Sequence, residues 1–444
     1  MATLKSLDYK IWGIAWPAIL ANLSVPLLGL VDAAILGHLD SSRYLGAVAL
    51  GAALLSFLYW GFGFLRMGTT GRVARALGAG SQARAERELG RAMWLALGLA
   101  LAVWLAHPLW LDLGFALMAP DAELLPLARE YTAIRIASAP AVLVTYAVVG
   151  WCIGRQDTRW PLAILLLTNL SNILLDVLLI LGLGLASKGA AMATLLAEYL
   201  GCGMALWVVQ RQVLGWRRDF PALLREPRHF LPLLHANRHL FLRTICLLGA
   251  LAFFTAMGEK FGAATLATNA LLMQLVMVTA YAMDGFAFAA EGLAGQRAGA
   301  GDNAGFTAAV ERSALWCLAT AGSMSLLFLL SGPWLFRQLT DLPEVLALLH
   351  HYGPWLVLLP LVTAPAYLFD GVFIGAACTR DLMRSMLVST GLVYLPAWYL
   401  TRDWGNSGLW LAFTLFSAAR GFTLYRRFRR RQSAEGWNPT GTVD

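Results

Sequence analysis

Apolar residues along this chain fall into long runs, separated by short charged or Gly/Pro-rich stretches. The run from Trp94 to Leu117 is one of several that extend about 20 residues or more with few charges. An α-helix needs roughly 20 apolar residues to cross a hydrocarbon core about 30 Å thick. Only helices and closed barrels satisfy their backbone groups in lipid, and the alternating pattern of barrel strands is absent. The pattern predicts an all-α integral membrane protein.

The runs give twelve candidate transmembrane helices, six on each side of a polar, basic break. We expect two pseudo-symmetric six-helix bundles, at 1–211 and 237–426, joined by a cytoplasmic linker at 212–236 and followed by a basic cytoplasmic tail at 427–444. The expected spans are 11–36, 45–70, 92–118, 126–153, 160–184, 188–211, 237–260, 264–296, 312–338, 348–376, 383–402 and 405–426.

The two halves resemble each other in sequence. A shift of 221 residues places Gly71 on Gly292 and Gly78-Ala79-Gly80 on Gly299-Ala300-Gly301. A shift of 225 places Ala139-Pro140-Ala141 on Ala364-Pro365-Ala366, and Gly150 on Gly375. Because each half begins on the same side of the membrane, we interpret this as a parallel repeat, of the kind found in some secondary transporters.

Composition supports a membrane protein and indicates its orientation. Hydrophobic residues make up 59% and charged residues 14%, against roughly 25% charged residues in soluble domains. With the N-terminus inside, 24 of the 34 Lys and Arg residues fall in cytoplasmic segments and 6 in outside loops. We therefore expect both termini in the cytoplasm. The net charge of +8 then reflects orientation in the membrane, and we expect no nucleic-acid partner.

The five cysteines form no CxxC pair and lie in or beside apolar segments, so neither a disulfide framework nor a zinc site is expected. The chain also lacks a Walker loop, a zinc-binding HExxH and a DDxxD run. We expect no organic cofactor and no bound metal beyond a coupling ion.

Ionisable residues inside membrane spans are costly and usually face protein or a water-filled cavity. In the first half, Asp32 lies near the outer end of its helix, and Asn172 and Asp176 share one face of another. Thr194 lies at a similar depth on a third helix. These oxygens could hold H+ or coordinate Na+; polar contact between helices is the alternative.

The second half contains a possible polar site made by Arg243, Asp284, Glu291 and Asp370, in which Arg243 could pair with one of the acids. Arg420 lies close enough to a cytoplasmic end for its side chain to reach the interface. Arg135 has no evident partner in the sequence. Pro17 and Pro26 interrupt the first helix and are candidate hinge positions, because proline removes a backbone hydrogen bond.

Three segments carry a family resemblance. They read VPLLGLVDAAILGHLDSSRYLGAVALG, NLSNILLDVLLILGLGLASKGAAMATLLAEY and YAMDGFAFAAEGLAGQRAGAG. They resemble the multidrug and toxic compound extrusion (MATE) transporters, and within them most resemble the DinF branch. The resemblance covers nearly the whole chain. It implies two six-helix bundles around a central cavity, a first-half cation site at Asp32, Asn172, Asp176 and Thr194, and a bend at Pro17.

The resemblance implies a function as well. We expect a proton-coupled antiporter, with Na+ as the alternative ion, that exports organic and often cationic or amphipathic compounds by alternating access. Its place would be the bacterial cytoplasmic (inner) membrane, in contact with lipid, as a monomer and not as an enzyme. A flippase for lipid-linked oligosaccharide or lipid is the alternative within the same class. A membrane-embedded enzyme is a third reading, less favoured because its metal-binding motifs are absent.

The charge bias makes the orientation testable. A reporter that is active only in the cytoplasm, fused after Asp444, should give signal, because the basic segments anchor that end inside. The same reporter fused in the loop near Lys188 should stay silent. Activity of a periplasm-only reporter at the C-terminal fusion would contradict the twelve-helix arrangement.

Overall fold

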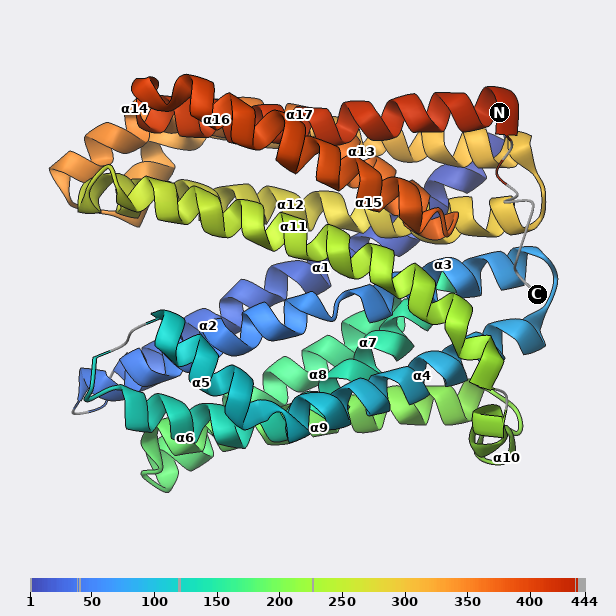
Figure 1. Ribbon diagram of the computed structural model, residues 1–444, viewed down its shortest axis with the longest axis horizontal. Helices are drawn as coiled ribbons and strands as arrows, with labels where there is room; N and C mark the ends of the chain where they lie inside the picture. The colour runs from blue at the N-terminus through green and yellow to red at the C-terminus, as the bar shows by residue number, and fades with distance from the viewer. Residues whose placement is uncertain are drawn as a thin grey trace. The chain divides into compact units, whose positions relative to one another are not determined.

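The structure, a computed structural model, describes residues 2–37, 39, 41–118, 121–225, 227–435 and 437. Every regular element in this part of the chain is helical (Figure 1). Within these residues, ten stretches are helical, long and apolar enough to cross a membrane. They correspond to the first ten expected spans. The all-helical membrane fold expected from the sequence is confirmed.

The helices of the first half precede a short connecting segment. They are α1 (Ala2–Gly37), α2 (Ser42–Gly61), α3 (Phe64–Gly78), α4 (Gln82–Leu105), α5 (His107–Met118), α6 (Leu125–Arg135), α7 (Ala139–Gly154), α8 (Arg159–Asp176) and α9 (Ala186–Gln212). The expected linker contains α10 (Trp216–Ala222). The second half contains α11 (Leu231–Glu259), α12 (Ala263–Gly299), α13 (Asn303–Leu339), α14 (Pro343–Gly375), α15 (Thr379–Val388), α16 (Leu395–Thr401) and α17 (Asn406–Arg430).

Several expected spans consist of two helices in the structure. The span at 126–153 is divided by a 3₁₀ turn at Ile136–Ser138, immediately before Pro140 in the first turn of α7. Proline is tolerated there because the first helical N–H groups have no intrahelical acceptor. The span at 383–402 is divided by a π turn at Ser389–Tyr394. Part of the expected tail, residue 436 and residues 438–444, lies outside the described residues.

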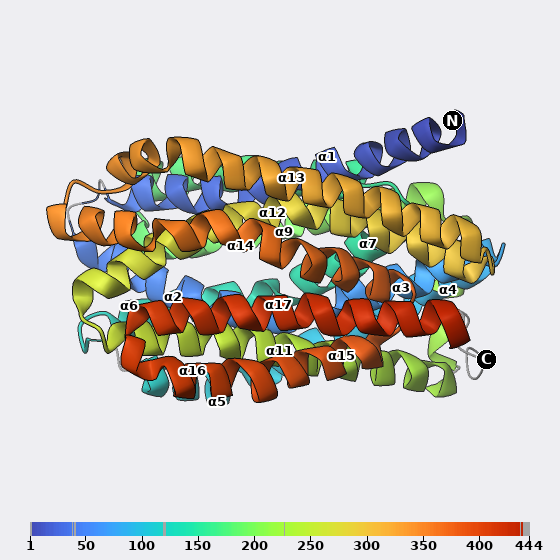
Figure 2. The ribbon, with the colours of Figure 1, turned by 90° about the horizontal axis from the view of Figure 1, so that it is seen from above.

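Packing divides the chain into two units, which we describe separately. Unit 1 comprises Met1–Ile19, Ala74–Ser81 and His235–Asp444, and unit 2 comprises Leu20–Val73 and Gln82–Leu234. In unit 2, α8 packs on α9 and α4 packs on α7. In unit 1, α14 packs on α12, α13 and α17 (Figure 2). The expected bundle boundaries at 211/212 and 236/237 stay a prediction.

Close helix packing in both units depends on glycines four residues apart. In unit 2, Gly150 and Gly154 of α7 lie against backbone carbonyl oxygens of α3, those of Arg66 and Thr70. A Cβ atom at either glycine would overlap the carbonyl it faces. Small residues at this spacing let two helix backbones approach closely, which is how membrane helices gain dispersion energy in the absence of a hydrophobic driving force.

Unit 1 repeats this contact with the same spacing. Gly371 and Gly375 of α14 lie against the carbonyl oxygens of Ala287 and Glu291 in α12. Each of these four residue numbers exceeds its first-half counterpart by 221. The same shift relates two residues with positive φ after these helices, Gln156 (φ 64°) and Ala377 (φ 56°).

The repeat therefore has one register throughout the residues that carry this packing. The shift of 225 that the sequence suggested for this helix pair, with Gly150 on Gly375, is wrong by four residues, about one helical turn. Apolar sequence of low complexity matches itself at neighbouring turns, and only the contacts between helices distinguish one turn from the next.

The glycine contact predicts a stability difference between two substitutions. Gly371→Ala should lower the thermal unfolding temperature of the purified protein, because its Cβ would force α12 and α14 apart, at a cost of about 1–3 kcal/mol. Gly322→Ala is the matched control, since nothing lies within 4 Å of its added Cβ, and it should be neutral or stabilising. Equal behaviour of the two variants in a heating and size-exclusion assay would contradict this packing.

Candidate functional site

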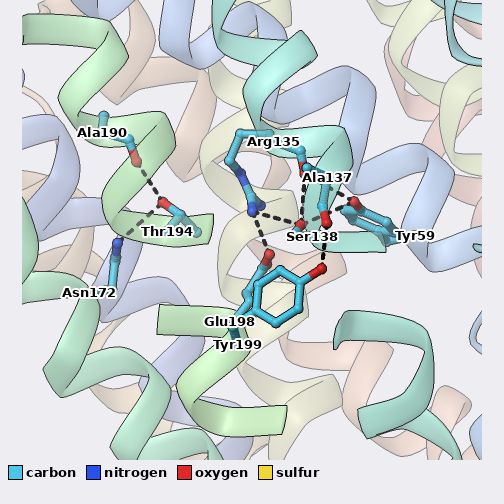
Figure 3. A network of polar contacts seen from close by, with 9 residues as sticks. All are labelled: Tyr59, Arg135, Ala137, Ser138, Asn172, Ala190, Thr194, Glu198 and Tyr199. Carbon is cyan, nitrogen blue, oxygen red and sulfur yellow. Dashed lines mark hydrogen bonds and ion pairs between the residues drawn. The ribbon is translucent and has the colours of Figure 1, made fainter. Parts of the chain in front are cut away.

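The first-half polar residues expected from the sequence lie within unit 2, on helices α1, α8 and α9. The Asn172 amide of α8 donates a hydrogen bond to Thr194 Oγ1 of α9 at 3.2 Å (Figure 3). The Thr194 hydroxyl donates in turn to the Ala190 carbonyl at 2.9 Å. Because the Asn172 Nδ2 is engaged in this way, its Oδ1 is the atom left available, and it is buried without a donor.

The Asp32 carboxyl of α1 lies within hydrogen-bonding range of the Asp176 carboxyl of α8. Asp176 is 1% exposed, and Asn172, one turn earlier on the same face, is fully buried. In the described structure, no donor reaches Asp32 Oδ1 or either Asp176 oxygen. Two ionised carboxylates this close repel each other, since both can only accept hydrogen bonds.

The backbone departs from an α-helix directly after Asp176. Residues Val177–Gly182 form a π turn between α8 and the loop that leads to α9. A π turn inserts an extra residue into the helix and frequently accompanies functional sites, because it turns side chains away from the regular helical positions. Asp176 is the last residue of the regular helix before this change.

A second polar network lies beside these carboxyls. Arg135 of α6 donates to Glu198 of α9 at 2.5 Å and to the Ser138 hydroxyl at 3.2 Å (Figure 3). Tyr59 contacts the same hydroxyl at 3.3 Å. Arg135 also acts electrostatically on Asp32. The Arg135–Glu198 pair could not be predicted from the sequence, because the partners are 63 residues apart on different helices.

The second-half residues meet in unit 1. Asp370 of α14 is bonded by two guanidinium groups, those of Arg243 on α11 and Arg420 on α17, the latter at 2.7 Å. All three side chains are buried. Asp284, like Arg243 and Asp370, acts electrostatically on Tyr367 of α14. Glu291 is 1% exposed, and it too has at least one bonding or electrostatic partner.

This arrangement corrects the interpretation of Arg420. The sequence placed it near enough to the interface to reach water, but the side chain is 6% exposed and is neutralised inside unit 1. In the Arg243–Asp370–Arg420 group one carboxylate bonds two groups of opposite charge, whereas the Asp32–Asp176 pair brings two acids together. Among the described residues, no group of three or more His, Cys, Asp or Glu side chains could hold a metal ion.

The candidate hinge residues Pro17 and Pro26 both lie within α1, which is helical throughout its described length. Packing assigns the helix to unit 1 up to Ile19 and to unit 2 from Leu20. The change of assignment therefore falls between the two prolines. Asp32 belongs to the part of the helix that packs in unit 2.

Comparison with known proteins identifies the family. The MatE family model matches residues 17–178 and 240–400, most of the chain. The chain belongs to the MATE family of transporters. It is 39% identical to DNA damage-inducible protein F of Escherichia coli over 98% of this chain and 95% of the relative. A probable multidrug resistance protein NorM of Caulobacter vibrioides is 27% identical, over 93% of this chain and 89% of the relative.

Solved MATE structures share the fold. A mutant of the Vibrio cholerae MATE transporter VcmN superposes with a TM-score of 0.86 at 21% identity, covering 98% of this chain and 99% of the other. A Pyrococcus furiosus transporter, whose report describes a binding pocket of reverse polarity, gives a TM-score of 0.84 at 20% identity, covering 96% of both chains. This MATE protein is thus a multi-pass, DinF-like membrane transporter. The family consists of ion-coupled transporters of small organic substrates and not of enzymes.

The two acidic clusters should respond in opposite ways to neutralisation. Asp370→Asn leaves two buried guanidinium charges without their acid, and removing one partner of a buried pair costs about 3–5 kcal/mol. The thermal unfolding temperature of the purified transporter should fall. Asp176→Asn removes no ion pair and should leave that temperature unchanged or higher. A fall for Asp176→Asn as large as that for Asp370→Asn would show that the first-half carboxyls are structural.

Proposed function

We propose that this MATE protein exports small organic compounds, often cationic or amphipathic, in exchange for protons entering the cell. It would work by alternating access in the bacterial inner membrane, as a monomer with both termini in the cytoplasm. The observation that carries the proposal is the contact between the Asp32 and Asp176 carboxyls, which has no donor. The names of the multidrug-resistance relatives support the class of substrate.

The geometry favours a proton over a sodium ion as the coupling cation. A proton satisfies two facing carboxyl groups directly, because it forms a hydrogen bond between one oxygen of each. Na+ needs several oxygen ligands at once. Asp32 Oδ1, Asn172 Oδ1 and the Asp176 oxygens are available, but Thr194 donates its hydroxyl proton to Ala190 and receives one from Asn172. Thr194 therefore has less capacity left for a metal ion than the sequence suggested.

The Arg135–Glu198 pair places a positive and a negative charge together beside the carboxyls, so the two charges largely offset each other there. An unpaired arginine beside Asp32 would bind the ionised carboxylate and hold it in one state. Because Glu198 accepts a hydrogen bond from Arg135 at 2.5 Å, much of that positive charge is already compensated. The site can then exist with its proton and without it, as an exchanger requires.

Exchange also requires that proton and substrate favour different conformations, since a ligand shifts an equilibrium only by its differential affinity. Helix α1 connects the site to such a change. It holds Asp32 in unit 2 while its first residues pack in unit 1. We propose that the prolines act as hinges between these parts, Pro17 more than Pro26, because proline removes a backbone hydrogen bond. Protonation of the carboxyl pair would then be transmitted along α1.

The coupling site predicts a selective loss of driven transport. Asp32→Asn and Asp176→Asn should each abolish export driven by a pH gradient in proteoliposomes, because asparagine keeps the size and hydrogen bonding but cannot exchange a proton. A Na+ gradient imposed alone should drive no export by the unsubstituted protein. Asp112→Asn is the control, since that carboxylate is exposed and paired with Arg129.

Purified variants would be reconstituted at matched levels, with folding checked by thermal unfolding. Near-normal driven export by both first-half variants, with loss in folded Asp370→Asn, would move the site to the second half. Export that needs ATP and ignores both gradients would contradict cation coupling. Translocation of a lipid-linked oligosaccharide without either gradient would favour the flippase.

A further inference from the structure

A basic pocket lies in unit 1, between α15 and the end of α17 that carries its arginines. Its free volume of about 200 Å³ is several times the roughly 30 Å³ that one water molecule occupies, so it can admit a group the size of a phosphate ester. The residues that matter for its chemistry are Asp381, Arg384, Ser385, Arg426, Arg427 and Arg430.

The pocket has an excess of positive charge. Asp381 is the acid among its lining residues, and it is already bound by Arg431 at 2.8 Å, with Arg427 3.9 Å away. The described structure gives no acidic partner to Arg384, Arg426 or Arg430. Three arginines therefore line a common space whose single carboxylate is occupied, and the Arg426 guanidinium also lies 5.8 Å from the centre of the Phe422 ring. Guanidinium groups bind phosphate through paired N–H donors, which makes such a space suited to a phosphate.

The walls of the pocket are held in place without a ligand. The Ser385 and Thr423 hydroxyls hydrogen-bond to each other across α15 and α17 at 2.6 Å. Thr423 also donates to the Ala419 carbonyl of its own helix at 2.7 Å. The two helices are thereby fixed side by side, so binding would not have to order them first. Such preorganisation lowers the free-energy cost of binding.

The surroundings of the pocket favour a lipid over a free anion. Exposed apolar side chains are close to it in sequence on both helices: Val388 of α15 lines the pocket, Leu387 precedes it, and Phe422 and Tyr425 lie on α17. Leu387 and Val388 come after Arg384 on α15, and Phe422 and Tyr425 come before Arg426 on α17. On each helix they lie on the side of the arginine that leads into the apolar segment. A ligand with a phosphate in the pocket would place its hydrocarbon chains along these side chains. An inorganic anion would leave them uncovered.

The repeat shows that the fold does not require these arginines. The shift of 221 places Arg426 and Arg430 on Ala205 and Val209 of α9, and Arg384 on Ala163 of α8. The equivalent positions of the first half are thus apolar, although α8 and α9 correspond to α15 and α17 in the repeat. The pocket is an addition of the second half, and its arginines are not needed for the helix packing that the two halves share.

We propose that this pocket binds the phosphate head group of an anionic phospholipid from the membrane leaflet that the arginine-rich end of α17 faces. The arginines hold the phosphate, and the bordering apolar side chains contact the acyl chains. Basic pockets between transmembrane helices bind anionic head groups through this combination of charge and apolar contact. The site is separate from the carboxyl pair of unit 2, and its existence does not depend on the coupling ion.

The test is lipid binding to the purified full-length protein, measured by titration in native mass spectrometry. The probes are phosphatidylglycerol, phosphatidylcholine with identical acyl chains, and inorganic phosphate. Arg384→Gln, Arg426→Gln and Arg430→Gln should each weaken the first phosphatidylglycerol site about fivefold, the effect expected from one basic residue near a lipid surface. Arg429→Gln is the matched control, because Arg429 is exposed on the same turn of α17 but does not line the pocket.

We expect Arg429→Gln to change this affinity less than twofold, and phosphatidylcholine to bind at least tenfold more weakly than phosphatidylglycerol. An equal loss in Arg429→Gln would show diffuse attraction to the basic surface and would overturn the site. Equal binding of the two lipids would show that the head-group charge is irrelevant. Displacement of the lipid by an equal concentration of inorganic phosphate would make a free anion the ligand. Thermal unfolding of each variant separates loss of binding from loss of folding.

Discussion

A charge buried within a membrane protein has no water to solvate it, and this cost decides how the polar residues of this chain are arranged. Buried arginines in both units bond acidic side chains. Asp370 is bonded by Arg243 and Arg420 in unit 1, and Glu198 by Arg135 in unit 2. The Asp32–Asp176 contact departs from this rule, because it brings two acids together without a base between them. We propose that a shared proton removes the conflict, and that this proton is the one the transporter exchanges.

The internal repeat separates the scaffold from its chemistry. Glycines that bring helix backbones together recur in both halves at one register, as Gly150 and Gly371 do. The ionisable residues of the two buried polar sites do not recur. The same shift places Asp32 on Phe253, and Glu198 on Ala419. The fold can therefore be built without these side chains at the equivalent positions, which argues that each half acquired its charges for a purpose other than folding.

Much of this could be predicted from the sequence, for a physical reason. Apolar runs and the charges within them are local features, so the helices and the places of Asp32, Asp176 and Asp370 within them could be predicted. Contacts between helices could not. The partner of Arg135 was unknown, Arg420 was assigned to the interface, and the repeat of α7 was placed one turn away from its true register. Each of these depends on which helix faces which, and a hydropathy pattern does not contain that information.

The central claim is that the Asp32–Asp176 pair holds an exchangeable proton, and infrared difference spectroscopy of the purified protein tests it most directly. A spectrum recorded between acidic and alkaline solution should contain the carbonyl band of a protonated carboxyl group that loses its proton as the pH rises. The account predicts that this band is altered or lost in Asp32→Asn and in Asp176→Asn, persists in Asp112→Asn, and is unaffected by added Na+. A band that is unchanged in both first-half variants would contradict the account.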